Sequence, residues 1–294
     1  MANVRMKQRN AASVVLLLVI FWLCFGSNAS AWLEKGHHMV VQNALLKLPE
    51  GMPPCLKENA GVMAYLSMQP DMWKRYAKEL RASEYPNHYL DLEKIDEDVT
   101  RIKLPEDRYA AIKLYLEKGE MPRGIGLLPY QMLDYCQRLE GVFREYRKDP
   151  SNQGIRHAIV HYAGVLAHYA GDTAQPLHTT IHYNGRILAD GTVEYKGIHK
   201  RVDGLAINSF IEAEKCIPFL APPEVYEDPA DDIMRAILAS HSLVDEVYRL
   251  EEQGRLDTPD AATKRFFHER LAAGSQLLLN LWYTAWKKSE EERP

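Results

Sequence analysis

Hydrophobic residues recur every three or four positions along most of this chain, which is the spacing of one face of an α-helix. The clearest case is a C-terminal stripe of apolar residues at Phe266, Phe267, Leu271, Leu277, Leu278, Leu281, Trp282 and Trp286. We expect helices over Asp71–Ala82, Asp107–Lys118, Gln131–Arg147, Ile155–Ala170, Val202–Lys215, Asp231–Leu250 and Ala261–Trp286. Strand-like alternation is nearly absent, and only Arg186–Lys196, around Asp190-Gly191, predicts a hairpin. The pattern therefore predicts an all-α fold made of one multi-helix domain.

The first 31 residues differ in character from the rest of the chain. Residues 1–31 carry Arg5, Lys7 and Arg9 but no acid, then an apolar run, and they end in Ala29-Ser30-Ala31. This order is typical of a secretory signal peptide that is cleaved between Ala31 and Trp32. A single membrane anchor is the alternative, but the apolar run is short for a membrane span. We expect a mature domain over residues 32–294 that is secreted or periplasmic, soluble and monomeric.

The composition narrows the class of protein. Of the 294 residues 46% are hydrophobic and 26% charged, and 36 basic residues nearly balance 40 acidic ones. These values exclude a disordered chain and a cationic protein that coats nucleic acid. Cys55, Cys136 and Cys216 allow at most one disulfide in the mature domain, without indicating which. Eleven histidines against four cysteines favour metal chemistry with nitrogen and oxygen ligands.

Two His–Asp pairs with a spacing of four residues carry the strongest chemical signal. His168 and Asp172 lie one helical turn apart in the segment HYAGDTAQPLH, which a proline then turns toward His178. His199 and Asp203 repeat the same spacing. Imidazole and carboxylate on one helix face can ligate a metal, although such a pair also occurs on solvated helix surfaces.

With Trp32, His37, Asp71 and His88 upstream, this pattern resembles that of one superfamily. It joins the bacterial zinc-dependent phospholipases C to the single-strand-specific zinc nucleases of fungi and plants. Their pattern is an N-terminal Trp, then His, Asp and His, then His-x3-Asp-x5-His, and finally His-x3-Asp or His-x3-Glu. Every residue of that pattern occurs in this sequence in the same order, over about 170 residues. The resemblance implies a secreted all-α hydrolase that holds three zinc ions.

The resemblance also implies a ligand set for each zinc ion. One zinc ion would be held by Asp71, His88, His168 and Asp172. A second zinc ion close to it would be held by the free amine and carbonyl of Trp32, by His37 and by Asp172, which would bridge the two ions. The third zinc ion would be held by His178, His199 and Asp203. His38 competes with His37, and the spacing from Trp32 favours His37. In the implied mechanism a hydroxide that bridges the paired zinc ions attacks phosphorus, and Asp71 could also orient the water.

The substrate is less sharply indicated than the reaction. The short gap from Trp32 to His37, the aromatic Tyr89 beside His88, and Asp203 as last ligand are nuclease-like, and Tyr89 would stack on a base. Gly197-Ile198-His199 instead resembles the phospholipases. We therefore expect hydrolysis of single-stranded nucleic acid, with phosphatidylcholine-like lipid as the alternative substrate. A non-catalytic, zinc-stabilised helical protein is a further alternative.

We expect Arg123 and Lys113 to lie on a solvated helix face rather than in a basic patch.

Overall fold

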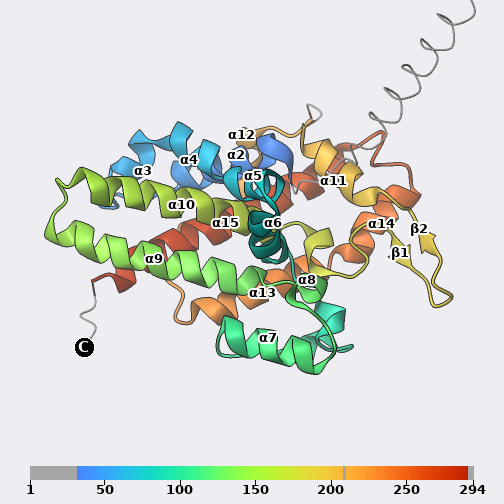
Figure 1. Ribbon diagram of the computed structural model, residues 1–294. Coiled ribbons are helices and arrows are strands. Elements are labelled where there is room, and N and C mark those ends of the chain that lie inside the picture. The colour runs from blue at the N-terminus through green and yellow to red at the C-terminus, as the bar shows by residue number, and fades with distance from the viewer. Residues whose placement is uncertain (1–31, 208–209, 291–294) are drawn as a thin grey trace, which may run out of the picture.

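The computed structural model describes residues 32–207 and 210–290, which form a helical protein with one small two-stranded sheet (Figure 1). This architecture confirms the all-α class. The expected signal peptide, residues 1–31, lies outside the described residues. Among the helices of the described part, none combines the length and the apolar character that a membrane span requires.

Four long helices build the centre of the molecule. They are α2 (Leu33–Leu46), α9 (Leu128–Lys148), α10 (Gln153–Thr173) and α15 (Ala261–Lys288). Helix α10 contacts the other three, and residues 163–173 of this helix are all buried. The second half of α10 is buried on every side, and this half carries the His168–Asp172 pair into the centre of the protein.

Shorter elements surround these four helices. The remaining α-helices are α3 (Cys55–Glu58), α4 (Ala60–Leu66), α5 (Gln69–Tyr76), α6 (Lys78–Glu84), α7 (Arg108–Glu117), α8 (Pro122–Ile125), α11 (Ile198–Ile207), α12 (Ala213–Cys216), α13 (Pro229–His241) and α14 (Val244–Glu252). Single 3-10 turns occur at η1 (Tyr85–His88), η2 (Leu92–Lys94), η3 (Val99–Arg101), η4 (Pro176–Thr179) and η5 (Ile217–Phe219). Several helices begin where an Asp or Asn side chain accepts hydrogen bonds from the first free N–H groups. These capping residues are Asp107, Asn152, Asp228 and Asp260.

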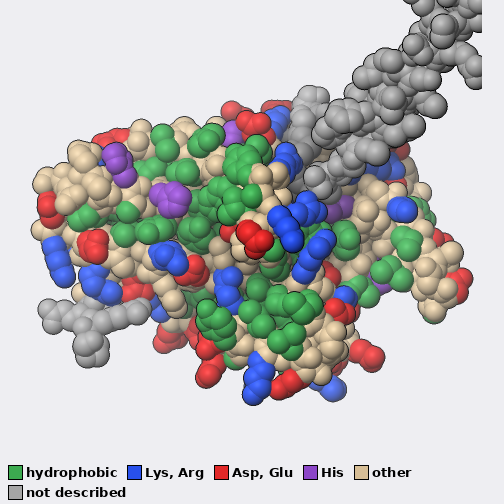
Figure 2. All heavy atoms as spheres, viewed as in Figure 1, with side chains coloured by type: hydrophobic (Ala, Val, Ile, Leu, Met, Phe, Trp, Pro, Cys, Tyr) green, Lys and Arg blue, Asp and Glu red, His purple; other side chains and the backbone are tan. Residues whose placement is uncertain are grey.

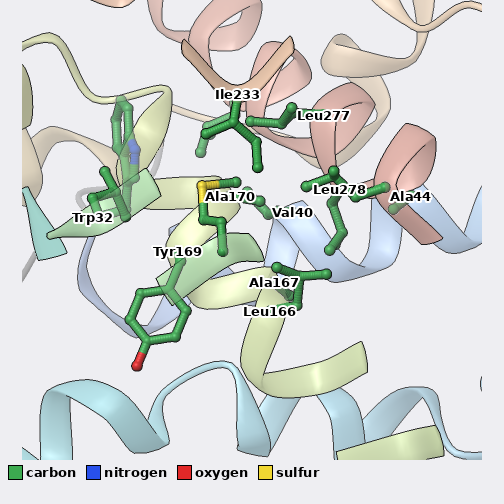
Figure 3. Close-up of a cluster of buried hydrophobic side chains, with 14 of the residues drawn as sticks. Trp32, Val40, Ala44, Leu166, Ala167, Tyr169, Ala170, Ile233, Leu277 and Leu278 are labelled. Atoms are coloured by element: carbon green, nitrogen blue, oxygen red, sulfur yellow. The ribbon is translucent and has the colours of Figure 1, made fainter. Parts of the chain in front are cut away.

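The hydrophobic core lies between α2, α10, α13 and α15 (Figure 3). Val40 and Ala44 from α2 meet Leu277 and Leu278 from α15 there, and all four are buried. Most of the predicted C-terminal stripe is buried, as expected, and its two members Phe266 and Trp286 are partly buried. Trp32 is fully buried, and its ring meets that of Phe267 edge-on with centroids 6.2 Å apart. The start of the described chain is therefore anchored in the core.

Three of the expected helices are interrupted. The segment Asp71–Ala82 is divided between α5 and α6 by Ala77, whose backbone is extended. The segment Val202–Lys215 is divided because residues 210–212 are not helical, and Asp231–Leu250 because the chain turns at 242–243. Each break lets two short helices pack in different directions. The periodicity of the sequence therefore predicts longer helices than the structure has. Helix α2 was not among the predicted helices, whereas α7, α9, α10 and α15 match their predictions closely.

The predicted hairpin and the cysteines can also be placed. Strands β1 (Arg186–Ile187) and β2 (Val193–Glu194) pair antiparallel, which confirms the hairpin around Asp190-Gly191. Cys55, Cys136 and Cys216 are buried with free thiols, so no disulfide links the described cysteines.

Candidate metal centre

Eight histidine and aspartate side chains from six elements converge beside the buried half of α10. His37 comes from α2, Asp71 from α5, His88 from η1, His178 from η4, and the two remaining pairs from α10 and α11. All eight residues are buried, with at most 8% of each residue exposed. The set consists of His37, His88, His168, His178, His199, Asp71, Asp172 and Asp203. The structure thus gathers every side chain of the sequence-predicted ligand set into one region.

The first predicted set, Asp71, His88, His168 and Asp172, is tightly clustered. Asp172 Oδ2 lies 3.0 Å from His88 Nδ1 and 3.2 Å from His168 Nε2. Asp71 Oδ1 lies 3.8 Å from each of the same two nitrogens. In each of two groups, His88–His168–Asp172 and His37–Asp71–His168, the nearest nitrogen and oxygen atoms all lie within 4.8 Å of one another. Such groups of buried imidazole and carboxylate could hold a metal ion.

The second predicted set is brought together in part. His37 Nε2 lies 3.6 Å from Asp172 Oδ1, whereas the nearest nitrogens of His88 and His168 lie beside Asp172 Oδ2. His38 is half-buried, and no contact joins it to the eight side chains within the described chain, so His37 fits the position better. The Trp32 indole donates a 2.8 Å hydrogen bond to the Gly171 carbonyl, and the Trp32 backbone is close enough to Asp203 to act to lower the pKa of this carboxyl group. The Trp32 backbone therefore lies beside the centre, next to a carboxylate of the third set.

The third predicted set, His178, His199 and Asp203, lies next to the first. His178 Nε2 and His199 Nε2 are 3.0 Å apart, and His199 Nε2 is 3.4 Å from Asp203 Oδ2. His178 Nδ1 is also 3.6 Å from Asp172 Oδ1, so the two groups are contiguous. Gln175 fixes Asp203, because its amide donates a 2.9 Å hydrogen bond to Asp203 Oδ1 while its carbonyl accepts from the backbone of Leu177.

Backbone carbonyls orient two of the imidazole rings. His168 Nδ1 donates to the Ser67 carbonyl, and His178 Nδ1 donates to the His88 carbonyl, each at 2.7 Å. A ring that donates from Nδ1 keeps the lone pair of a neutral imidazole on Nε2. In both rings Nε2 faces the cluster, which is the arrangement that metal-binding histidines commonly have.

Burial dominates the protonation of this cluster. It lowers the pKa of His168 and of His199 to about 4, and it lowers those of His88 and His178 well below the usual value, so these imidazoles are neutral at pH 7. Neutral imidazole is the form that binds metal.

The three carboxyl groups behave differently from one another. Burial raises the pKa values of Asp172 and Asp203 well above the usual range, because little positive charge faces them. Burial also acts to raise the pKa of Asp71, but Lys74, with its Nζ 2.6 Å from Asp71 Oδ1, and nearby His168 and His37 outweigh it and lower the pKa. A divalent cation would supply the charge that Asp172 and Asp203 otherwise lack.

Unsatisfied polar atoms test whether the cluster suits a metal. Asp172 Oδ1, which faces His37 and His178, and Asp203 Oδ2, which faces His199, are buried and have no hydrogen-bond partner among the described residues. Buried polar atoms are rarely left without a partner, and an ion is one common explanation. The donors are nitrogen and oxygen atoms of His and Asp, which suit zinc. The residues present therefore fit a metal centre.

A pocket with a volume of about 500 Å³ opens beside the cluster. It is lined by His88, His178 and His199 of the cluster and also by Asp91, three tyrosines and five cationic side chains. The cationic residues are Lys74, Arg75, Arg81, Lys94 and Arg123, and the tyrosines are Tyr85, Tyr89 and Tyr183. Figure 2 shows Lys and Arg side chains gathered beside α6 on this face of the molecule. Arg123 and Lys113 are both exposed on helices, as expected, and Arg123 also lines this pocket.

Backbone pairing joins this pocket wall to the cluster. The Leu90 N–H donates to the His178 carbonyl at 2.9 Å, and the Asp91 N–H donates to the Ile125 carbonyl at 2.7 Å. The segment that holds His88 and Tyr89 is thereby fixed between η4 and the end of α8. The Tyr89 hydroxyl also donates to the Arg123 carbonyl. Tyr89 and the backbone of Arg123 are therefore held in a defined position relative to the histidines.

Several residues of the site were not predicted from the sequence. Lys74, three residues after Asp71 on one helix, had a usable signal in that spacing. Gln175 and Ser67 had none, because their contacts depend on the folded chain. In comparisons with known proteins, the chain matches no protein-family model and no curated protein.

Proposed function

We propose that this protein is a zinc-dependent phosphodiesterase that hydrolyses single-stranded nucleic acid. One observation carries the proposal: a buried cluster of five histidines and three aspartates opens into a pocket lined by five cationic side chains and three tyrosines. The cluster suits metal ions that act on a phosphodiester, and the pocket suits an anionic chain with aromatic bases.

The proposed ligand sets follow the three groups described above. Asp71, His88, His168 and Asp172 would hold one zinc ion; Trp32, His37 and Asp172 a second; and His178, His199 and Asp203 a third. When bound, zinc supplies Lewis-acid charge and acidifies water near neutral pH. Processing after Ala31, in a secreted or periplasmic protein, would give Trp32 the free amine that its proposed role requires.

The chain's own residues would bind and orient the phosphodiester. Lys74 is 14% exposed, lines the pocket and contacts Asp71, so it could place a positive charge against a phosphate oxygen. Asp71, whose pKa is lowered, stays a carboxylate that can accept a hydrogen bond from water. Tyr89 is proposed to stack on a base next to the scissile bond, since its ring is fixed beside His88.

The pocket charge favours nucleic acid over a choline lipid. Five cationic side chains attract a strand with several phosphates and repel the quaternary ammonium of phosphatidylcholine. Asp91, which supplies the one carboxyl group among the described residues that line the pocket, has its pKa raised by burial to about 8 and so carries little negative charge at pH 7. Phosphatidylcholine is nevertheless a second candidate, because Tyr85, Tyr89 and Tyr183 could contact an ammonium through their ring faces.

An open pocket also argues for catalysis over a purely structural metal. Structural zinc sites are closed by four protein ligands, whereas catalytic sites keep a position for water or substrate. Here three of the histidines line a pocket that reaches solvent.

The test is metal analysis combined with substrate assays. The chain from Trp32 onward is purified, its zinc content measured, and its activity tested on single-stranded DNA, RNA and phosphatidylcholine vesicles. The proposal predicts bound zinc and cleavage of the nucleic acids, abolished by a chelator and restored by zinc. Cleavage of the lipid alone would replace the nuclease by a phospholipase, and zinc binding without any hydrolysis would indicate a structural centre.

A further inference from the structure

Two arginines of the pocket wall share one aromatic ring. The guanidinium carbons of Arg81, on α6, and Arg123, on α8, lie 5.4 and 5.1 Å from the centroid of the Tyr85 ring. All three residues line the pocket, together with His88, His178 and His199 of the metal centre. Two positive charges from distant parts of the sequence are therefore brought to the same place, beside the candidate centre.

No carboxylate of the described chain forms an ion pair with Arg81 or Arg123, and their guanidinium groups donate no hydrogen bond within it. Most other arginines of the protein differ in this respect. Carboxylate partners lie within 4.0 Å of Arg101, Arg138, Arg144, Arg147, Arg156, Arg186, Arg201, Arg235, Arg249, Arg255 and Arg265. The surface charges are thus generally compensated, but those around Tyr85 are not.

A guanidinium group that lies against an aromatic ring can still use its N–H donors. Two such groups, each with unused donors, match the several acceptor oxygens and the negative charge of a phosphate. Arg81 and Arg123 line the same pocket as the histidines but contact none of the eight residues of the centre within the described chain. A phosphate held between them would be a different one from the phosphate at the centre.

We propose that Arg81 and Arg123 bind a second phosphate of the substrate, adjacent in the strand to the phosphodiester that is cleaved. This inference rests on the proposed nuclease function. The two arginines would be specificity-determining residues that favour a strand with consecutive phosphates over a substrate with a single phosphodiester. Tyr85 would be a positioning residue, which acts by holding the two guanidinium groups together.

The test compares substrates that differ by one phosphate group. The zinc-loaded protein is assayed on the dinucleoside monophosphate TpT and on pTpT and TpTp, which carry one more phosphate at the 5′ or 3′ end. We expect kcat/KM for one of the two phosphorylated forms to exceed that for TpT by about tenfold, as for a charge-assisted contact to one phosphate. In the variant R81Q/R123Q this ratio should fall to about one, and the salt dependence of kcat/KM for the phosphorylated form should weaken.

Matched variants separate the subsite from general electrostatics and from misfolding. Arg265→Gln removes a charge from an exposed arginine on α15 and should leave the ratio at its wild-type value. Tyr85→Phe keeps the ring and should keep the ratio, whereas Tyr85→Leu should lower it. Arg123 is exposed, so Arg123→Gln alone tests the subsite if the double variant does not fold.

The outcomes distinguish this inference from the proposed function. If the nucleotides are cleaved but neither added phosphate raises kcat/KM, or if R81Q/R123Q leaves the ratio unchanged, the second-phosphate subsite is wrong and the nuclease function stands. If phosphatidylcholine is cleaved and no nucleotide is, both are overturned.

Discussion

The carbonyl oxygen of Tyr89 lies 2.0 Å from the position that a Cβ atom on residue 126 would occupy. Gly126 avoids this overlap and also adopts a backbone φ of +107°, which other residues rarely reach. The close approach brings the chain after α8 against the segment that carries His88 and Tyr89, and allows the Asp91–Ile125 hydrogen bond described above. The geometry of the pocket wall thus depends on a residue without a side chain.

Replacing Gly126 by Ala should therefore destabilise the protein. We expect the free energy of unfolding to fall by at least about 2 kcal/mol, since a backbone clash adds to the conformational strain. Gly119→Ala is the matched control, because Gly119 also has a positive φ but a Cβ atom added there would meet no atom within 4 Å. Urea unfolding of both variants measures the difference, and equal losses would show that the Tyr89 contact does not matter.

Asp172 occupies the middle of the candidate centre. Its two oxygens lie within 3.6 Å of nitrogens of four imidazoles: His37, His88, His168 and His178. Asp172→Ala should therefore lose about two zinc ions per chain and nearly all hydrolytic activity, since the residue is proposed to bridge two metals. Asp134→Ala, at a carboxylate that pairs with Arg138 on α9, is the control for loss of one charge. A variant that keeps its full zinc content would rule out the bridging role, whatever its activity.

A form of the protein that begins at Trp32 offers a test of the proposed Trp32 ligand. The indole is anchored by Gly171 and by the edge-on contact with Phe267, so it should keep its place when one residue is added before it. The added residue converts the free amine into an amide, which is a much poorer metal ligand. We expect this extended form to bind about one zinc ion fewer per chain than the form that begins at Trp32, and to lose most of its turnover. Equal zinc content in the two forms would remove Trp32 from the ligand set.

The parts of the site that local geometry determines could be predicted from the sequence. His168 and Asp172, like His199 and Asp203, share a helix face because they are four residues apart. The pocket wall could not be predicted in this way, because Arg81 and Arg123 are 42 positions apart in the sequence and meet only through Tyr85. Tertiary packing also explains the break between α5 and α6, since Ala77 itself is a good helix former yet adopts an extended backbone.

Asp91 provides a prediction for the pH dependence of stability. It lines the pocket, and burial, followed by repulsion from Glu93 and Glu120, raises its pKa to about 8 against the opposing effect of Lys94. In the unfolded chain the same carboxyl group titrates near pH 4. Between these two values the folded protein holds a proton that the unfolded chain releases. The contribution of Asp91 to stability is therefore fully present below about pH 4 and is lost progressively as the pH rises to about 8.

Asn cannot ionise, so Asp91→Asn should remove this dependence. We expect the stability of the wild type relative to the variant to decrease by about 1–3 kcal/mol between pH 5 and pH 8, as measured by urea unfolding of the zinc-loaded proteins at a series of pH values. Asp96→Asn, at an exposed carboxylate a few residues along the chain, controls for the loss of one charge. The difference between wild type and Asp91→Asn cancels other titrations that both proteins share, including those of the metal ligands. A difference that is constant over this range would mean that Asp91 is ionised in the folded protein and that burial does not govern its pKa.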